Sequence, residues 1–199
     1  MLDSIITWTL DIIFSFGYLG IFALMFLEGI IVIIPSEALL LFAGYLVYIE
    51  KFNFLAVVLY STLGSMGVAM LYYWLALKGR RIIEKHGKKL FIKKQDVIKS
   101  EKWFKKHGEI TVFLLRFVPG FRSVISIPAG LAKMEIKKFI TYTFLGSLIW
   151  NSVLCYVGLS LGESWTAFFE LLNQYEIYII TIVGLLILFY FWKTKNKSH

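Results

Sequence analysis

The sequence predicts an all-α polytopic membrane protein: an inverted repeat of two re-entrant hairpins, each followed by a transmembrane helix, plus a C-terminal transmembrane helix and an N-terminal interfacial helix. Of the 199 residues, 58% are hydrophobic and 17% charged, whereas an average soluble domain has about 25% charged residues. A chain of this length cannot hide so much apolar surface in one soluble globule. The net charge of +8 is confined to residues 78–109, where twelve Lys or Arg stand against four Asp or Glu.

The first element is an amphipathic segment, residues 1–16, which we expect to be a helix at the membrane interface. Polar residues recur at every fourth position from Asp3 to Ser15, so they share one face of a helix. A spanning helix over residues 4–27 stays open as an alternative, although it would place Asp11 in hydrocarbon.

Three long apolar stretches predict helices that cross the bilayer. Residues 52–77 contain no charge and exceed the about 20 residues that a crossing requires. Residues 139–161 form the second expected span, with Asn151 as its most polar member. Residues 177–192 form the third, which is short and is followed by a lysine-rich tail that would anchor it at the cytoplasmic side.

Two further apolar stretches, residues 18–49 and 110–131, are predicted re-entrant hairpins because prolines and charges interrupt them. Proline breaks a helix, and broken backbone at membrane depth is tolerated only against protein or a water-filled cavity. The expected re-entrant turns contain Pro35, Pro119, Gly120 and Pro128. The interrupting charges are Glu28 and Glu37 in the first hairpin and Arg116 and Arg122 in the second.

The basic residues also set an expected topology. The basic loop and the lysine tail should both be cytoplasmic, whereas the connection that precedes the third span has three glutamates and no Lys or Arg. The chain is then one membrane domain, residues 1–199. Its parts are the interfacial helix (1–16), repeat one (17–78), the basic cytoplasmic loop (79–107), repeat two (108–162), the external loop (163–176), and the C-terminal helix with its tail (177–199).

An internal repeat underlies this division. Residues 17–29 read GYLGIFALMFLEG and residues 108–120 read GEITVFLLRFVPG, with glycines twelve positions apart in both. Each segment is followed by an Ala-Gly pair and then by a Leu-Gly-Ser triplet inside a long apolar run. A hairpin plus one crossing per unit makes the repeat inverted, as in many transporters. Shared apolar composition is the alternative explanation for so short a match.

The four hairpin charges are the candidate functional residues. Unpaired charges at the bilayer centre are costly, so two readings stay open: salt bridges that pin the hairpins together, or an anion site. Guanidinium groups hold phosphate bidentately and stay protonated when desolvated. We therefore expect Arg116 and Arg122 to bind a lipid phosphate, with Glu28 and Glu37 as counter-charges or proton acceptors.

Other function classes find little support. The three histidines lie in the basic loop or at the C-terminus, the single cysteine excludes an intrachain disulfide, and no nucleotide-binding, hydrolase or zinc motif is present. We expect no enzyme activity, no cofactor, no metal and no nucleic-acid partner. Apolar residues spaced among the lysines of the basic loop suit contact with anionic lipid headgroups. A homo-oligomer is compatible with the sequence, which sets no oligomeric state.

The second hairpin, FLLRFVPGFRSVISIPAGLAKMEIKKF, followed by LGSLIW, resembles the DedA family of bacterial membrane proteins. The resemblance covers about residues 15–162. The matching positions of the second half are Arg116, Pro119, Gly120, Arg122, Ala129, Gly130, Met134, Phe139, Gly146 and Trp150. Those of the first half, where the motif is weaker, are Glu28, Pro35, Glu37, Gly44, Gly64, Gly67, Tyr72 and Gly79. Val68 stands where many members have an acid, which weakens an inherited claim of proton coupling.

The resemblance implies a protein of the bacterial cytoplasmic membrane that is related to eukaryotic lipid scramblases. The expected function is a lipid translocase, or flippase, that returns undecaprenyl phosphate for cell-envelope synthesis, because a phosphate monoester requires arginines and little else. Phosphatidylethanolamine is the close alternative. A proton-coupled ion or drug transporter and a non-transporting scaffold also stay open.

Overall fold

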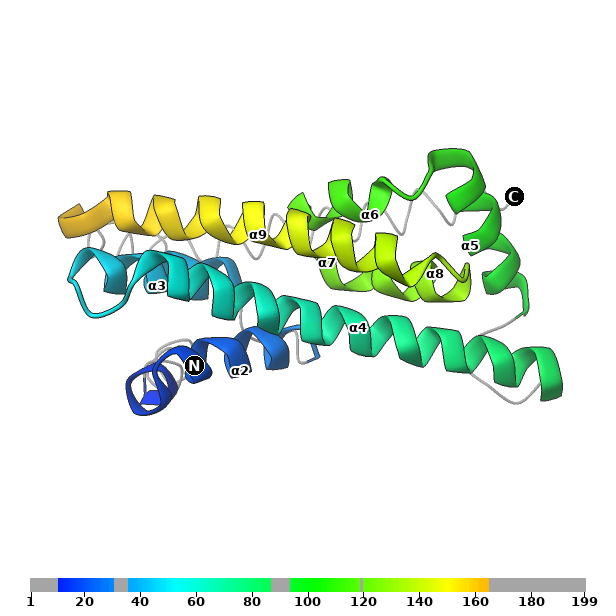
Figure 1. Ribbon diagram of the computed structural model, residues 1–199, viewed down its shortest axis with the longest axis horizontal. Helices are drawn as coiled ribbons and strands as arrows, with labels where there is room; N and C mark the ends of the chain where they lie inside the picture. The colour runs from blue at the N-terminus through cyan, green and yellow to red at the C-terminus, as the bar shows by residue number, and fades with distance from the viewer. Residues whose placement is uncertain (1–10, 31–35, 87–93, 119, 165–199) are drawn as a thin grey trace, which may run out of the picture. The chain divides into compact units, whose positions relative to one another are not determined.

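The computed structural model describes residues 11–30, 36–86, 94–118 and 120–164 of the chain (Figure 1). Within these ranges the secondary structure is helical, with no strand. The chain divides into two compact units, residues 1–160 and 161–199, and residues 161–164 are the described part of the second. Pro35, Pro119, most of the expected external loop and the expected C-terminal span lie outside the described residues.

The first half of the chain contains two short helices and one long one. Residues 11–16 are helical and lead through Gly17 into the next helix. The helices that follow are α2 (Tyr18–Glu28), α3 (Ser36–Tyr48) and α4 (Phe54–His86). The sequence predicted that the span would end at residue 77, but α4 continues through the first basic residues to His86, since nothing in that segment breaks a helix.

The second half contains a broken hairpin before its long helix. Its elements are α5 (Lys94–His107), α6 (Thr111–Leu114), the 3₁₀ helix η1 (Leu115–Phe117), α7 (Phe121–Val124), α8 (Ser126–Leu131) and α9 (Ile136–Leu161), followed by the 3₁₀ helix η2 (Gly162–Ser164). Gly120 has φ 77°, a left-handed conformation that interrupts the chain before α7 and that glycine adopts without strain. Pro128 lies inside α8.

The two long helices run antiparallel beside each other (Figure 1). Thr62 of α4 contacts Asn151 of α9, whereas further along α4 the ring of Tyr73 stacks on Phe139 near the start of α9. In the described part of the chain, Phe54–Arg80 and Ile136–Ser164 are long and apolar enough to cross a membrane. They correspond to the first two spans that the sequence predicts.

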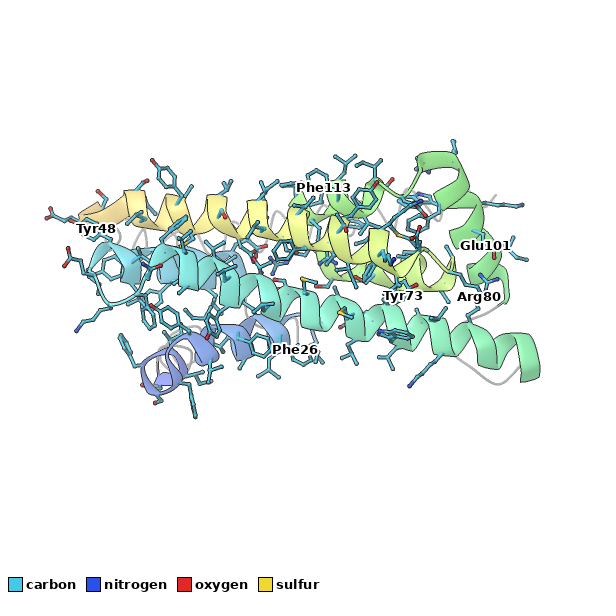
Figure 2. The ribbon with its side chains drawn as sticks, in the orientation of Figure 1. Phe26, Tyr48, Tyr73, Arg80, Glu101 and Phe113 are labelled. Carbon is cyan, nitrogen blue, oxygen red and sulfur yellow. The ribbon has the colours of Figure 1, made fainter. Side chains whose placement is uncertain are left out.

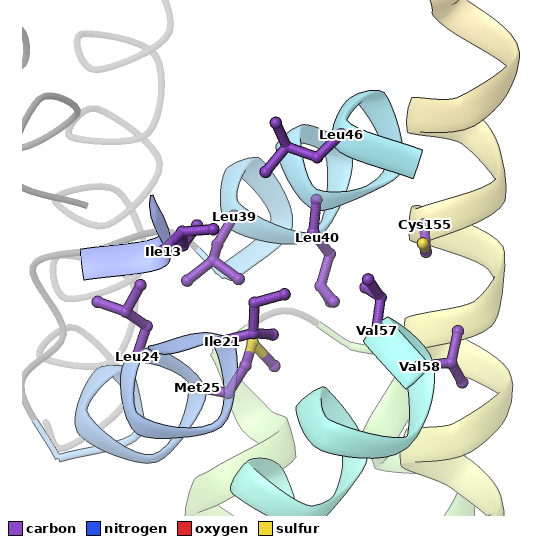
Figure 3. Packing of buried hydrophobic residues seen from close by; sticks show 11 residues of the cluster. Ile13, Ile21, Leu24, Met25, Leu39, Leu40, Leu46, Val57, Val58 and Cys155 are labelled. Carbon is purple, nitrogen blue, oxygen red and sulfur yellow. The ribbon is translucent and has the colours of Figure 1, made fainter. Parts of the chain in front are cut away.

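Two apolar clusters fill the interior toward opposite ends of this helix pair. The first joins α2 and α3 to the beginning of α4 and to Cys155 near the end of α9 (Figure 3). The second joins the broken hairpin to Tyr73 of α4 and to Phe139 of α9. Each short-helix hairpin therefore packs on both long helices.

Glycines permit close approaches between backbones at these contacts. A Cβ atom added at Gly44 of α3 would overlap the backbone of α9 at Cys155, and one added at Gly130 of α8 would overlap the backbone of α4 at Tyr73. Both glycines belong to the Ala-Gly pairs of the predicted repeat. Their missing side chains let each hairpin lie directly against the long helix of the other half.

A second pair of glycines brings each hairpin close to its own long helix. A Cβ atom at Gly64 of α4 would lie 2.8 Å from the Cβ of Met25, and one at Gly146 of α9 would lie 2.9 Å from the Cβ of Arg116. These are the glycines of the two Leu-Gly-Ser triplets. Gly146 thereby lets the Arg116 side chain enter the interior.

Helix α5 carries part of the basic segment and is tied to α4 by charge. Arg80 of α4 forms a salt bridge of 2.7 Å with Glu101 of α5 and also donates to the backbone carbonyl of Leu131 at the end of α8 (Figure 2). The basic segment is thus largely helical rather than an extended loop, with α4 reaching His86 and α5 beginning at Lys94.

Candidate anion-binding site

Arg116 is the most deeply buried charge in the described residues, with 2% of its surface exposed. Its Nη2 donates to the hydroxyl groups of Ser126, at 3.3 Å, and of Thr143, at 3.2 Å. Its Nε has no hydrogen-bond partner among the described residues. Both partners are neutral, so the guanidinium charge has no contacting carboxylate in the described part of the chain. A buried cation of this kind calls for an anion.

Arg122 has such an anion, since its Nη2 lies 2.8 Å from the Oε2 of Glu28. The same guanidinium donates to the hydroxyl of Ser36, in the first turn of α3. The Ser36 hydroxyl in turn lies 3.0 Å from a Glu28 oxygen and 3.2 Å from a Glu37 oxygen, and it can donate its hydrogen to one of them at a time. This cluster connects the end of α2, the start of α3 and the broken hairpin.

A small pocket lies between the two arginines. Its space for a water-sized sphere is about 10 Å³, which is the room that one water molecule needs. Its lining residues come from α2, α4, α7, α9 and η1, and they are Met25, Glu28, Ser65, Val68, Arg116, Arg122, Ser123, Ser147, Trp150 and Asn151.

Two of the lining residues from α9 have further unpartnered polar atoms. The indole Nε1 of Trp150 and the amide Oδ1 of Asn151 are buried with no hydrogen-bond partner in the described part of the chain. The Asn151 Nδ2 donates to the Thr62 hydroxyl at 3.3 Å. With the Arg116 Nε, all three of the unpartnered buried side-chain atoms found in the described residues belong to residues that line this pocket.

The structure separates the roles of the four charged residues that the sequence singled out. Arg122 and Glu28 form an ion pair, so the salt-bridge reading holds for them. Glu37 contacts the serine of that cluster, and Arg116 lies apart with hydroxyl partners. Salt bridging therefore accounts for one arginine and leaves the other without an ionic partner among the described residues.

Sequence reasoning passed over several lining residues. Asn151 stood out only as the most polar member of a span, and Ser65 and Ser147 only as the ends of the Leu-Gly-Ser triplets. Trp150 was identified only as a position that matches the family motif, with no binding role assigned to it. A polar residue in an otherwise apolar span was the available signal for Asn151. Among the described residues, no group of three or more His, Cys, Asp or Glu side chains could hold a metal ion.

The described residues are helical, include two helices long and apolar enough to cross a membrane, and contain a buried arginine in a polar pocket, as is typical of integral membrane proteins. The family model of the VTT domain matches residues 34–160, and the chain belongs to this family, which confirms the resemblance to DedA proteins. Its relatives are bacterial and the family is one of membrane proteins, which supports a location in a bacterial membrane.

Three of the relatives illustrate the similarity. The chain is 34% identical to undecaprenyl phosphate transporter A of Bacillus subtilis, over 100% of this chain and 96% of that protein. It is 37% identical to an alkaline phosphatase-like protein of Lactococcus lactis, over 92% of this chain and 93% of that protein. It is 30% identical to protein DedA of Escherichia coli, over 73% of this chain and 68% of that protein. No solved structure matches the chain.

The relatives named as transporters favour a membrane transporter or a lipid-related role over an enzyme.

Proposed function

We propose that the protein is a lipid translocase that carries a phosphate headgroup across the bacterial cytoplasmic membrane, with undecaprenyl phosphate as its substrate. The observation that carries the proposal is Arg116, a buried guanidinium whose partners in the described residues are neutral and whose Nε points to no acceptor there. A desolvated arginine that is not neutralised by the protein suits a ligand that brings its own negative charge.

Arg122, the second arginine of the pocket, differs from Arg116 because it already forms an ion pair with Glu28. The pocket has room for about one water molecule, so a phosphate group can enter only if the lining elements move apart. Parting the Arg122–Glu28 contact would widen the pocket and free a second guanidinium for the phosphate. Glu28 then acts as the counter-charge that holds Arg122 when no phosphate is bound.

We also propose that the two halves form an inverted repeat of re-entrant hairpins, and the glycine contacts support this. Cys155 and Tyr73, the backbones that the Ala-Gly glycines approach, both lie nine positions after the glycine of their own Leu-Gly-Ser triplet. Met25 and Arg116, which the triplet glycines approach, both lie eight positions after the first glycine of their repeat. Equivalent positions thus make equivalent contacts.

The pocket itself follows this symmetry. Six of its ten lining residues form three equivalent pairs, which are Met25 with Arg116, Ser65 with Ser147, and Val68 with Trp150. A site on the axis that relates two inverted halves can be reached from either side of the membrane when the halves exchange conformations. This supports transport through the pocket rather than static binding.

Two relatives bear the name undecaprenyl phosphate transporter A, and they support the choice of lipid. Phosphatidylethanolamine is the second candidate, because Glu28 could meet its ammonium group once released from Arg122. A proton-coupled exporter would instead make the glutamates primary and the arginines accessory.

The remaining sequence expectations belong to the same proposal. The chain forms one membrane domain with the basic segment and the C-terminal tail in the cytoplasm, where the lysines contact anionic headgroups.

Transport in vesicles of defined lipid tests the proposal. Purified protein is reconstituted, and transbilayer movement of a short-chain polyprenyl phosphate and of labelled phosphatidylethanolamine is followed, with protein-free vesicles as baseline. We expect the polyprenyl phosphate to move, and Arg116→Ala combined with Arg122→Ala to abolish the movement. Lys138→Ala removes an exposed cation of α9 and is the matched control, expected to transport normally.

The outcomes separate the candidates. Arg116→Lys should lose transport if the bidentate fork holds a phosphate, and should retain it if only charge balance matters. Movement of phosphatidylethanolamine alone would show that phosphatidylethanolamine is the substrate. If neither lipid moves above baseline, with or without an imposed proton gradient, lipid translocation is wrong.

A further inference from the structure

Two residues that line the pocket have buried polar atoms without a hydrogen-bond partner, and the proposed role of the arginines does not explain them. Trp150 and Asn151 are neighbours on α9, and the indole Nε1 and the amide Oδ1 lack partners in the described residues. Asn151 is 1% exposed. Buried polar groups in folded proteins are nearly always hydrogen-bonded. The equivalent positions of α4 carry Val68 and Ala69, so the apolar alternative already occurs in this fold.

The three unpartnered atoms differ in what they can bind. The Arg116 Nε and the Trp150 Nε1 are donors, which suit the oxygens of a phosphate. The Asn151 Oδ1 is an acceptor, because the amide nitrogen is directed to the Thr62 hydroxyl. An acceptor facing an anion is repelled unless that anion carries a hydrogen. A phosphate monoester with one negative charge has a P–OH group, whereas a phosphate diester has none.

We propose that Trp150 and Asn151 complete the headgroup site that Arg116 begins, and that they make it selective for a singly protonated phosphate monoester. This rests on the proposed function, in which Arg116 binds the phosphate. The Trp150 Nε1 donates to one phosphate oxygen, and the Asn151 Oδ1 accepts the hydrogen bond of the P–OH. A lipid diester of equal charge can use the donors but leaves the Asn151 oxygen unsatisfied.

The serines of the pocket fit the same arrangement. Ser65 and Ser147 line it from α4 and α9, and Ser123 lines it from α7. Hydroxyl groups can donate to phosphate oxygens or accept from a P–OH, so they tolerate either ester. Glu28 also lines the pocket with an acceptor that cannot donate, but its carboxylate already accepts from Arg122 and lies within hydrogen-bond distance of the Ser36 hydroxyl. Selectivity for the monoester therefore falls to the Asn151 Oδ1, which has no partner among the described residues.

Binding measurements on the full chain in detergent micelles test the proposal. Farnesyl phosphate and its methyl ester have the same tail, and the methyl ester has one charge and no P–OH. Isothermal titration of the wild type at pH 6 should give about tenfold tighter binding of farnesyl phosphate. Trp150→Phe keeps an aromatic ring but removes the indole N–H, and it should weaken the binding of both ligands by about five- to tenfold.

Asn151→Leu should remove the preference between the two ligands, weakening farnesyl phosphate about tenfold and leaving the methyl ester unchanged. The matched controls are Trp74→Phe, an exposed tryptophan of α4, and Ser152→Ala, whose hydroxyl bonds the carbonyl of Leu148 instead of facing the pocket. Both should bind like the wild type. Melting temperatures are measured for every variant, and Asn151→Ala replaces the leucine variant if that chain does not fold.

Failure of this inference is distinct from failure of the proposed function. If Arg116→Met abolishes binding but the Trp150 and Asn151 variants match their controls, the proposal for α9 is overturned and the phosphate site stands. Equal loss for both ligands in Asn151→Leu overturns the monoester selectivity, as does a short-chain phosphatidylethanolamine that binds as tightly as farnesyl phosphate. If the wild type binds neither farnesyl ligand, the proposed function itself fails.

Discussion

The hairpin of the first half and the hairpin of the second half pack in the same way but differ in chemistry. Glycines at equivalent positions bring both hairpins against both long helices. At the pocket, however, the first half presents Met25 and Val68 where the second half presents Arg116 and Trp150. The comparison teaches that the packing does not require the polar residues. Under the proposed function, they are present in one half because the phosphate requires them.

The two arginines offer a second comparison within the second half. Arg122 is tied by its ion pair to Glu28 of the first half, whereas Arg116 contacts only hydroxyl groups among the described residues. Arg122 therefore joins the halves, and Arg116 is the arginine that the proposed function assigns to the phosphate.

The shared packing is tested most strongly at Gly44 and Gly130. A leucine at either position would force a side chain into the backbone of a long helix, and we expect each to cost about 4 kcal/mol of unfolding free energy or to prevent folding. Gly108→Ala is the control: a Cβ there meets nothing within 4 Å, and only its φ of 76° is unfavourable, which costs about 1 kcal/mol. Denaturant unfolding in mixed micelles measures both. If a leucine is tolerated at only one of the two glycines, the two hairpins do not pack equivalently.

The contact between halves is tested by a double-mutant cycle of Glu28→Met and Arg122→Met. Each single substitution leaves a buried charge unpaired and should destabilise by about 3 kcal/mol, whereas the double variant should recover most of the loss. The exposed pair of Lys138 and Glu109, at 2.8 Å, is the control, and its coupling should stay below about 1 kcal/mol. Equal coupling in the two cycles would show that Arg122 and Glu28 do not hold the halves together.

The sequence predicted the helical membrane class and the two described spans because charge and hydropathy report on the bilayer directly. It also found both arginines, since a charge in an apolar stretch is visible without coordinates. It did not reveal which arginine would be paired, because Arg122 and Glu28 are 94 positions apart and meet only through tertiary packing. The sequence identified Trp150 as a family position but not its unpartnered indole N–H, because the lack of a partner is known only from the packing.

Arg116→Met tests whether the cation serves the ligand, since methionine is the residue at the equivalent position of the first half. Removing an unpaired buried charge should stabilise the protein by about 2 kcal/mol while transport of polyprenyl phosphate falls to the protein-free baseline. Unfolding in micelles and the vesicle assay measure the two effects on one preparation. Ser152→Ala is the control for both. A variant that transports normally, or that unfolds more easily than the wild type, would assign Arg116 a structural role instead.

Two neighbouring tyrosines of α4 give the finest comparison of the hairpins. Tyr72 donates to the carbonyl of Gly29 at the end of α2, at 2.5 Å, and Tyr73 donates to the carbonyl of Met134 after α8, at 2.6 Å. Tyr73 is buried, so Tyr73→Phe leaves a carbonyl without its partner and should cost about 1.5 kcal/mol, whereas the half-buried site of Tyr72 should lose about 0.5 kcal/mol in Tyr72→Phe. The exposed Tyr156→Phe provides the baseline.

Melting temperatures in micelles resolve these differences. The comparison that matters is which of the two variants, Tyr73→Phe or Tyr72→Phe, loses more stability. A larger loss at Tyr73 indicates that the end of the second hairpin is the firmer attachment, which suits the half that supplies Arg116. A larger loss at Tyr72 would place the firmer attachment at the first hairpin, next to Glu28. In that case the ion pair would be the fixed part of the site, and Arg116 would belong to the half that moves.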